Sequence, residues 1–195
     1  MTPGADPPSN LEFHPLTPDR WGDFEALFGT RGAYGGCWCM WWRASRKEFE
    51  ANQGDGNRDA MRAIVERGDI PGILAYADRK AVGWCSVAPR ESYAALERSR
   101  TLKRRDDAPV WSIVCFYVAK GYRGAGVAEA LAGAAVEYVR ERGGAVVEAY
   151  PTVPRTGSLP PVSSYMGVPS LFERVGFVEV ARPSASRAIM RYTIG

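Results

Sequence analysis

The sequence lacks any apolar run long enough to cross a membrane. A membrane-spanning helix needs about 20 predominantly apolar residues, and the apolar stretches in this chain of 195 residues are far shorter. The amino-terminal segment, MTPGADPPSN, also lacks the basic stretch followed by an apolar stretch that characterises a secretory signal. We therefore expect a cytoplasmic protein without a membrane partner.

Histidine and cysteine are scarce, which argues against a metal site. His14 is the only histidine, and the four cysteines include one close pair, Cys37 and Cys39, with no second Cys or His pair at metal-ligand spacing. Four cysteines in a cytosolic chain of this size do not indicate a disulfide framework. No histidine lies nearby in sequence to activate Cys37 or Cys39, so we expect these two, and also Cys115, to be packing residues.

A large excess of charge of one sign is also missing. The formal net charge of +3 is too small to indicate nucleic-acid binding. A local basic cluster lies within residues 98–105, and Asp106 and Asp107 follow it directly. We favour a solvated loop over an anion-binding site for this cluster.

The remaining composition is that of one soluble globular domain. Hydrophobic residues make up 46% of the chain and charged residues 24%, both ordinary values for such a domain. The length also fits a single domain with one substantial core. We expect a flexible amino-terminal lead-in over residues 1–9 and a single domain over 10–195.

The order of predicted elements indicates the fold class. Strands are predicted over 10–16, 73–77, 81–87, 110–118, 145–150 and 187–193, and helices over 18–28, 57–67, 127–142 and 169–175. The strand over 110–118 is apolar on both faces, as expected of a central strand covered from two sides. This mixed order predicts an α/β fold with a mixed, partly antiparallel central sheet flanked by helices on both faces.

The most informative segment is the glycine-rich turn between the strand over 110–118 and the helix over 127–142. Its glycines allow a sharp turn and a close approach of the backbone to a ligand. Free N–H groups at the start of a helix form a site for phosphate oxygens. A turn of this kind can also be a tight connection that binds nothing, and its glycine spacing fits neither a Walker loop nor a Rossmann fingerprint.

This turn resembles the pyrophosphate loop of the GNAT superfamily of acyltransferases. The family motif R/Q-x-x-G-x-G/A is matched by Arg123, Gly126 and Ala128, with Gly124 as an additional glycine. A second family pattern, which ends in G-F, is matched downstream by the segment from Tyr165 to Phe177. The resemblance extends over roughly residues 10–193 and is most specific at these two motifs.

The resemblance implies an acyl-CoA-dependent N-acetyltransferase that uses acetyl-CoA and no metal. Main-chain groups of the outer part of the central strand, at Phe116, Tyr117 and Val118, would contact the pantetheine arm. A backbone N–H in that region would polarise the thioester carbonyl. The loop that would hold the pyrophosphate consists of Arg123, Gly124, Ala125, Gly126, Val127 and Ala128.

The sequence departs from the family pattern where the catalytic groups are expected. Phe172 stands where many members have a tyrosine that protonates the departing thiolate, and Ser112 stands near the position of a strand glutamate that some members use as a base. Tyr165 is the nearest phenol that could replace the missing acid. Glu148 is the best remaining carboxylate for the base, although a solvent-facing strand residue is an equally good interpretation of it.

Three tryptophans, Trp38, Trp41 and Trp42, fall within five residues of the segment over 30–44. In proteins of this family the segment after the first helix borders the acceptor side. The tryptophan rings either complete the core beneath the sheet or form an acceptor pocket whose flat walls hold an apolar group or face a cation. We expect the proline-rich loop over 151–168 to cap this site, with a mobile surface loop as the alternative.

The predicted reaction is transfer of acetyl from acetyl-CoA to a primary amine of a small molecule or a protein N-terminus, by direct attack in a ternary complex. Such an attack needs mainly positioning and the loss of one proton. A homodimer is compatible with the sequence. The alternative function is a catalytically weak acyl-CoA-binding module or regulator, which the missing tyrosine and glutamate would fit.

Overall fold

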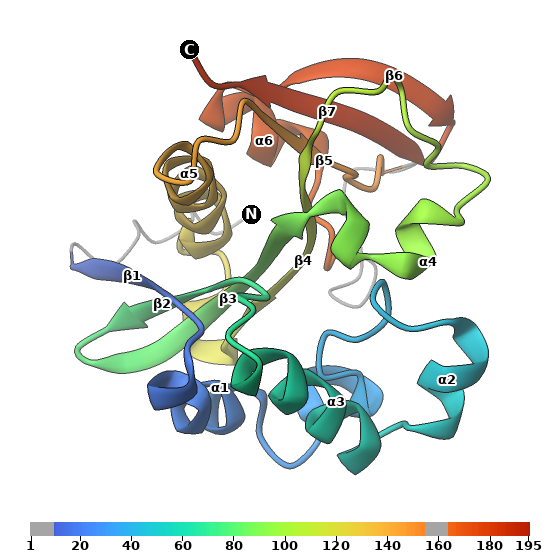
Figure 1. The fold of residues 1–195 in the computed structure, drawn as a ribbon. Coiled ribbons are helices and arrows are strands. Elements are labelled where there is room, and N and C mark those ends of the chain that lie inside the picture. Colours follow the sequence, from blue (N-terminus) through green and yellow to red (C-terminus); the bar gives the residue numbers. More distant parts are fainter. Residues whose placement is uncertain (1–9, 155–163) are drawn as a thin grey trace.

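The computed structural model describes residues 10–154 and 164–195, and the predicted lead-in over 1–9 lies outside the described residues. The described chain folds around one mixed seven-stranded sheet with the order β1-β2-β3-β4-β5-β7-β6 (Figure 1). Neighbouring strands are antiparallel except for the parallel pair β4 and β5. The strands are β1 (Leu11–Pro15), β2 (Ile73–Ala77), β3 (Lys80–Pro89), β4 (Trp111–Val118), β5 (Val146–Ala149), β6 (Val178–Ser184) and β7 (Arg187–Thr193).

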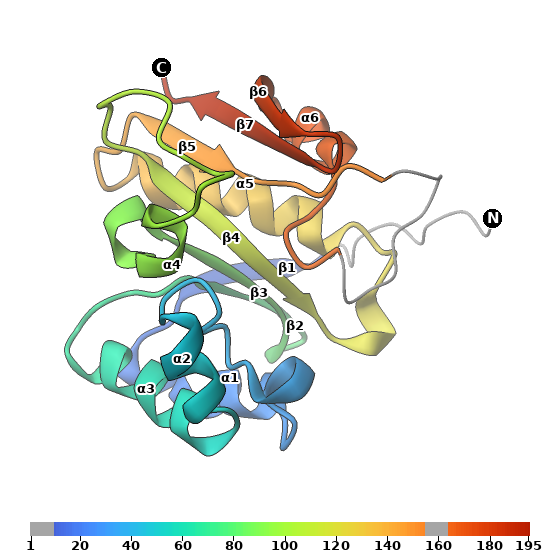
Figure 2. The same ribbon diagram turned by 90° about the vertical axis from the view of Figure 1, so that its right-hand side faces the viewer.

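Helices cover both faces of the sheet, as the order of elements predicts (Figure 2). The helices are α1 (Trp21–Phe28), α2 (Arg46–Ala51), α3 (Asp55–Glu66), α4 (Ala94–Glu97), α5 (Val127–Arg140) and α6 (Pro169–Val175). α5 and α6 pack into one apolar core with side chains such as Val87 and Ile113, whereas α1 and α3 pack into a second core with Leu74 and Trp84. None of the helices in the described part of the chain has the length and apolar character that a bilayer crossing requires.

Most element predictions are confirmed, and the exceptions have local causes. β6, α2 and α4 were not predicted. β6 is an edge strand that buries no side chain, and its alternation is confined to Val178, Glu179 and Val180, while α4 has four residues and is too short for a helical pattern. The start of α2 is indicated in the sequence by a capping box of Ser45 and Glu48. Apolar periodicity, on which the predicted helices rest, does not detect a capping box. Thr17 precedes a 3-10 turn at Pro18–Arg20, but its hydroxyl accepts a hydrogen bond from Arg20 and does not cap a backbone N–H.

The central strands separate where a ligand would need room. β4 pairs with β5 only from Trp111 to Ile113, while on its other side β4 pairs with β3 as far as Val118. The outer half of β4 is therefore not paired with β5, and one of its main-chain groups, the Phe116 N–H, donates to the Tyr165 carbonyl instead. This divergence exposes main-chain groups of a central strand at the start of the glycine-rich turn.

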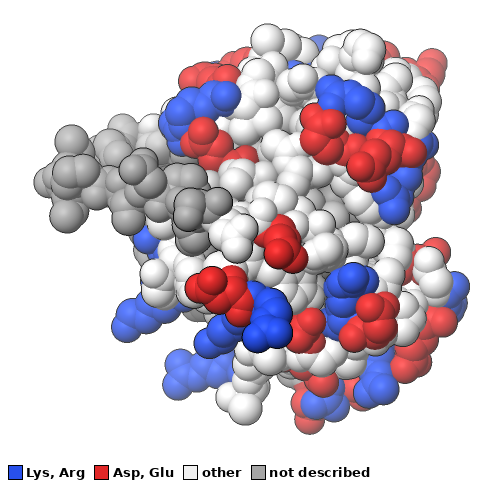
Figure 3. Space-filling view, turned by 90° about the vertical axis from the view of Figure 1, so that its left-hand side faces the viewer, with Lys and Arg blue, Asp and Glu red and all other residues white. Residues whose placement is uncertain are grey.

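Charged side chains of both signs are interspersed on the face shown in Figure 3. Several charged residues of the chain form exposed pairs at helical spacing, such as Arg46 with Glu50 and Arg62 with Glu66. Pairs of this kind contribute little to stability because water screens them. The face in Figure 3 is thus a solvated surface without a large region of one sign.

Candidate active site

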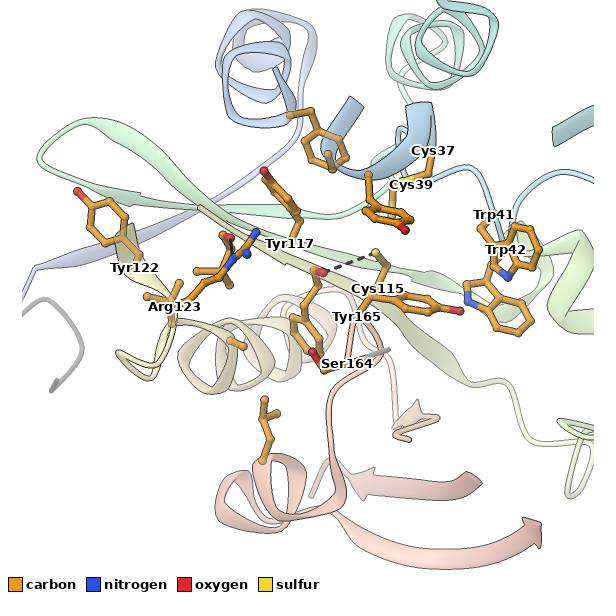
Figure 4. Close-up of a pocket in the computed structure, with 18 of the residues that line it drawn as sticks. Cys37, Cys39, Trp41, Trp42, Cys115, Tyr117, Tyr122, Arg123, Ser164 and Tyr165 are labelled. Carbon is orange, nitrogen blue, oxygen red and sulfur yellow. Dashed lines mark hydrogen bonds between the residues drawn. The ribbon is translucent and has the colours of Figure 1, made fainter. Parts of the chain in front are cut away.

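One elongated cavity of about 1100 Å³ crosses the outer half of β4. Figure 4 shows Tyr122 and Arg123 at one end and Trp41 and Trp42 at the other. We call residues 122–129 the loop end. We call the opposite part, formed by Trp41, Trp42 and Phe49, the aromatic end.

The loop end has a geometry suited to an anion. Gly124 and Gly126 have φ values of +79° and +70°, a conformation that costs glycine little and other residues more. Gly126 is the N-cap of the 14-residue helix α5, so the unpaired N–H groups of the first turn lie at the cavity. The Arg123 Nε donates to the Val118 carbonyl at 2.9 Å, which ties the turn to the end of β4.

Most of the predicted loop residues line this end. Arg123, Gly124, Val127 and Ala128 are lining residues together with Gly126. The Ala125 side chain is buried and does not line the cavity, so only its backbone is available to a ligand.

The middle of the cavity is formed by the open edge of β4. Phe116, Tyr117 and Val118 line it, as the resemblance implies. The Phe116 N–H donates to the Tyr165 carbonyl at 2.6 Å. The Tyr165 carbonyl therefore already uses the Phe116 N–H, one of the main-chain groups that a pantetheine arm would contact. Contact between Phe116 and the acetyl donor stays a prediction.

Tyr165 is placed as a protonated phenol within the cavity. Burial raises the pKa of its hydroxyl to about 12, and the neighbouring Trp42 indole acts weakly in the opposite direction. Figure 4 shows the phenol pointing toward Trp42. A group with such a pKa can donate a proton at neutral pH but cannot act as a base.

Phe172 occupies the core and takes no part in the cavity surface. Its side chain is fully buried, and its ring packs against Phe116 and Phe177 with centroid distances of 5.9 Å and 5.2 Å. The position that would carry a phenol in many relatives of the family is therefore apolar and structural here. Tyr165 lines the cavity and its carbonyl accepts from the Phe116 N–H of β4, so its role as the proton donor stays a prediction.

The position of Glu148 fits neither of its two predicted interpretations, a catalytic base or a solvent-facing strand residue. Glu148 is 1% exposed, so it does not face solvent, and it does not line the cavity. Its carboxylate accepts hydrogen bonds from Arg90 at 3.0 Å, Tyr150 at 2.7 Å and Arg191 at 2.7 Å. The Ser112 hydroxyl lies 2.8 Å from the Tyr150 hydroxyl, so it belongs to the same buried network.

The predicted tryptophan wall divides into core and cavity residues. Trp38 is 5% exposed, stacks on Phe28 at 5.7 Å between ring centroids, and does not line the cavity, so its predicted role as an acceptor wall is wrong. Trp41 and Trp42 do line the aromatic end, and Trp41 is 44% exposed. Sequence density alone could not separate the rings, because Trp38 is turned inward by a left-handed backbone with φ of +42°.

The cavity is lined between its two ends by three cysteines, Cys37, Cys39 and Cys115. We expected these residues only to pack, not to border a cavity. Cys115 lies on β4 directly before Phe116, and Cys39 comes from the segment that carries the tryptophans. No local sequence signal brings Cys39 and Cys115 together, because the pairing depends on how that segment packs against the sheet. Among the described residues, no group of three or more His, Cys, Asp or Glu side chains is placed to hold a metal ion.

The loop that we expect to cap the site is described only in part. Residues 155–163, which include Pro160 and Pro161, lie outside the described residues. Ser164 and Tyr165, at its carboxyl end, line the cavity. The capping role stays a prediction.

Comparisons with known proteins agree with this geometry. Residues 38–160, more than half of the chain, match the model of the family described as the acetyltransferase (GNAT) family. None of the curated proteins compared with the sequence matches it.

Similar solved structures share the fold at low sequence identity. The PaiA N-acetyltransferase from Thermoplasma acidophilum, in complex with coenzyme A, is 16% identical, covers 95% of this chain and 99% of its own, and has a TM-score of 0.54. A polyamine N-acetyltransferase from Drosophila melanogaster is 12% identical, with coverages of 95% and 100% and a TM-score of 0.57. A ribosomal-protein-alanine N-acetyltransferase from Brucella melitensis is 17% identical, with coverages of 94% and 99% and a TM-score of 0.51.

Proposed function

Because the chain belongs to the acetyltransferase (GNAT) family, we propose that it transfers an acetyl group from acetyl-CoA to a primary amine carried by a flat, apolar body. The observation that carries this proposal is the single cavity that joins a phosphate-binding turn to an aromatic end across an open strand edge. Donor and acceptor can then occupy the cavity together, and the amine can attack the thioester directly in a ternary complex.

The loop end has the groups that a coenzyme A pyrophosphate requires. Backbone N–H groups at the start of α5 and the Arg123 guanidinium supply hydrogen bonds and positive charge. The open edge of β4 accepts an extended pantetheine arm in the manner of an added strand. Acetyl-CoA supplies the activated acyl group as a thioester, whose carbonyl would lie near Phe116.

The aromatic end favours an acceptor without additional positive charge. Of the described residues that line the cavity, Glu129 is the only carboxylate, and its oxygen lies 2.6 Å from the Arg174 Nε at the loop end. A polyamine would leave its second cation without an anionic partner in this cavity. A small aromatic amine, or a protein N-terminus followed by an apolar side chain, fits the rings of Trp41 and Trp42 better.

A panel of acceptors tests this proposal. We expect thiol release from acetyl-CoA with arylalkylamines and with apolar amino-terminal peptides, and little release with spermidine or agmatine. Trp41→Ala should raise KM for the preferred acceptor about 2- to 10-fold, because an aromatic contact contributes about 0.5–1.5 kcal/mol. Acetyl-CoA affinity should not change.

The matched control for Trp41 is Trp38 in the same segment. Trp38→Ala should lower the free energy of unfolding by about 3–5 kcal/mol, as expected for a buried ring, and should leave acceptor KM unchanged in the folded fraction. Faster transfer to spermidine than to any apolar amine would refute the acceptor class. Coenzyme A binding without transfer to any amine would indicate a binding module instead of an enzyme.

We further propose that Tyr165 protonates the departing coenzyme A thiolate. Tyr165→Phe removes the proton donor, and we expect kcat to fall by about 10²-fold, the low end of the range for a general acid, because a thiolate already leaves readily at neutral pH. Steady-state kinetics check the rate, and calorimetry should find coenzyme A binding unaltered. Wild-type turnover with an unaltered pH profile would show that solvent supplies this proton.

A further inference from the structure

The acceptor side of the cavity has no conventional base among the described residues. The lining residues include no histidine, and the single lining carboxylate, Glu129, is paired with Arg174 at the loop end. Glu148 and Ser112 belong to the buried network around Arg90. A primary amine that attacks a thioester must still lose a proton.

We propose that the Cys39 sulfur, as a thiolate, is the general base that takes this proton. Cys39 lines the cavity beside the aromatic end, and the Trp84 indole N–H donates to its sulfur at 3.2 Å. The Cys115 thiol of β4 is the neighbour that acts most strongly on this sulfur, and its own hydrogen bond runs to the Phe116 carbonyl at 3.8 Å. The Trp84 N–H is thus directed at the sulfur as an acceptor, and a hydrogen bond of this kind is stronger when the acceptor is an anion.

A nearby cation lacks a carboxylate partner, which is independent support for an anion at Cys39. The half-buried Arg43 guanidinium donates to the Pro71 carbonyl at 2.8 Å and the Tyr93 hydroxyl at 3.3 Å and lies over the Tyr93 ring. It forms no ion pair with a carboxylate of the described chain, and its Nε has no hydrogen-bond partner there. A buried cation is costly without a counter-ion, and a thiolate at Cys39 provides one.

The electrostatic environment favours the charged form of Cys39 over that of its neighbours. The interaction with Cys115 lowers the pKa of Cys39 to about 7 against the opposing effect of burial, and Trp84 and Arg43 act in the same direction as Cys115. The interaction with Cys39, together with burial, raises the pKa of Cys115, so Cys39 is the thiol of this pair that ionises at the lower pH. The titratable or charged groups around Cys39 are Cys37, Arg43, Cys85, Tyr93, Cys115 and Tyr165.

The backbone at Cys39 is also unusual. Its φ of +60° is a left-handed conformation that a glycine would adopt at lower cost. The chain therefore places a thiol where the local conformation disfavours any side chain. This cost is consistent with a chemical use for the sulfur.

If the proposed function holds, on which this inference rests, every proton that the amine releases has an acceptor in the site. The amine nitrogen attacks the thioester carbonyl, the C–N bond forms, and the Cys39 thiolate accepts the proton released by that nitrogen. The C–S bond then breaks and the departing thiolate takes a proton from the Tyr165 phenol. The proton on Cys39 returns to the Tyr165 oxygen through solvent, which regenerates both groups.

The ionisation of Cys39 can be measured without any acceptor. The difference in ultraviolet thiolate absorption between the wild type and Cys39→Ser should show one thiolate forming with a midpoint near pH 7. In Cys115→Ala this midpoint should move to higher pH, because the neighbour that acts most strongly on the sulfur is gone. A difference spectrum that stays flat until the ordinary range for cysteine, about 8.5, would overturn the proposal.

Kinetics then connect this ionisation to transfer. Cys39→Ser should lower kcat by about 10²-fold without weakening acetyl-CoA binding. Protonation of the acceptor affects kcat/KM of the wild type and of the variant equally, so it cancels in the ratio of the two values. This ratio of wild-type to variant kcat/KM should rise with pH through about 7, as the Cys39 base becomes ionised. Cys85→Ala, which removes a thiol from the core outside the cavity, is the matched control and should keep the wild-type profile.

Two further results would overturn the role of Cys39 as a base. Unchanged kcat and pH dependence in Cys39→Ser would exclude it while leaving acetyl transfer intact. An acetyl adduct on Cys39, detected by intact mass after reaction with acetyl-CoA alone and discharged by the amine, would identify a nucleophile instead. A wild-type protein that transfers acetyl to no amine would refute the proposed function itself, separately from the thiolate measurement.

Discussion

Gly126→Asp is expected to weaken coenzyme A binding by about 10²–10⁴-fold. The aspartate carboxylate would stand at the N-cap of α5, where the proposed pyrophosphate contacts the N–H groups of the first turn. Each charge-assisted hydrogen bond lost costs about 1.5–3 kcal/mol, and repulsion between the carboxylate and the pyrophosphate adds to this. Isothermal titration calorimetry with coenzyme A measures the effect.

The opposite end of the same helix supplies the control. Gly143 has φ of +71°, close to the +70° of Gly126, with open space where a Cβ would stand. Gly143→Asp therefore imposes a similar backbone penalty and the same charge far from the cavity. It should bind coenzyme A like the wild type. Equal affinity in a folded Gly126→Asp variant would exclude the loop end as the pyrophosphate site.

A second large effect is expected on stability when Glu148 loses its charge. Glu148 accepts hydrogen bonds from Arg90, which is fully buried, and from Arg191, which is mostly buried. Glu148→Gln removes the buried anion and leaves each cation only its more exposed partner, Glu97 for Arg90 and Asp106 for Arg191. Breaking a buried ion pair on one side costs about 3–5 kcal/mol, so we expect a loss of that size in the free energy of unfolding measured with urea.

The control for Glu148 is an exposed carboxylate in a simple pair. Glu50 lies 2.8 Å from Arg46 on the surface of α2, and Glu50→Gln should have little effect on unfolding, because water screens such pairs. Folded Glu148→Gln protein should keep its kcat, because the carboxylate does not line the cavity. Wild-type stability together with lost turnover would restore Glu148 as a catalytic candidate.

The network around Glu148 explains why the sequence misled on this residue. An alternating strand such as β5 usually places a charged residue toward solvent. Here the segment between β3 and β4 covers this part of the sheet, and Arg90 from its start reaches Glu148 and Tyr150. The partner residues lie about 60 positions apart in the chain, so no local pattern indicates the pairing.

The geometry of the proposed donor half was predictable because it depends on residues that are consecutive in the chain. A strand, a turn with glycines at 124 and 126 and a helix beginning at Val127 are consecutive in the chain, and glycine is needed there for positive φ. The family motif falls on these same residues. The apolar character of β4 on both faces likewise identifies a central strand from its residues alone, and β4 is the middle strand of the sheet.

The acceptor half was decided by tertiary packing. Trp38, Trp41 and Trp42 look equivalent in sequence, yet Trp38 enters the core and the other two reach the cavity, because the backbone of this segment is irregular. Cys39 meets Cys115 and Trp84 only when the segment after α1 packs on the sheet. The sequence by itself determined the fold class, the glycine-rich turn before α5 and the family, since each depends on residues that are close in the chain. The proposed base and the proposed acceptor walls depend on side chains from separate elements, so only the folded structure could bring them together.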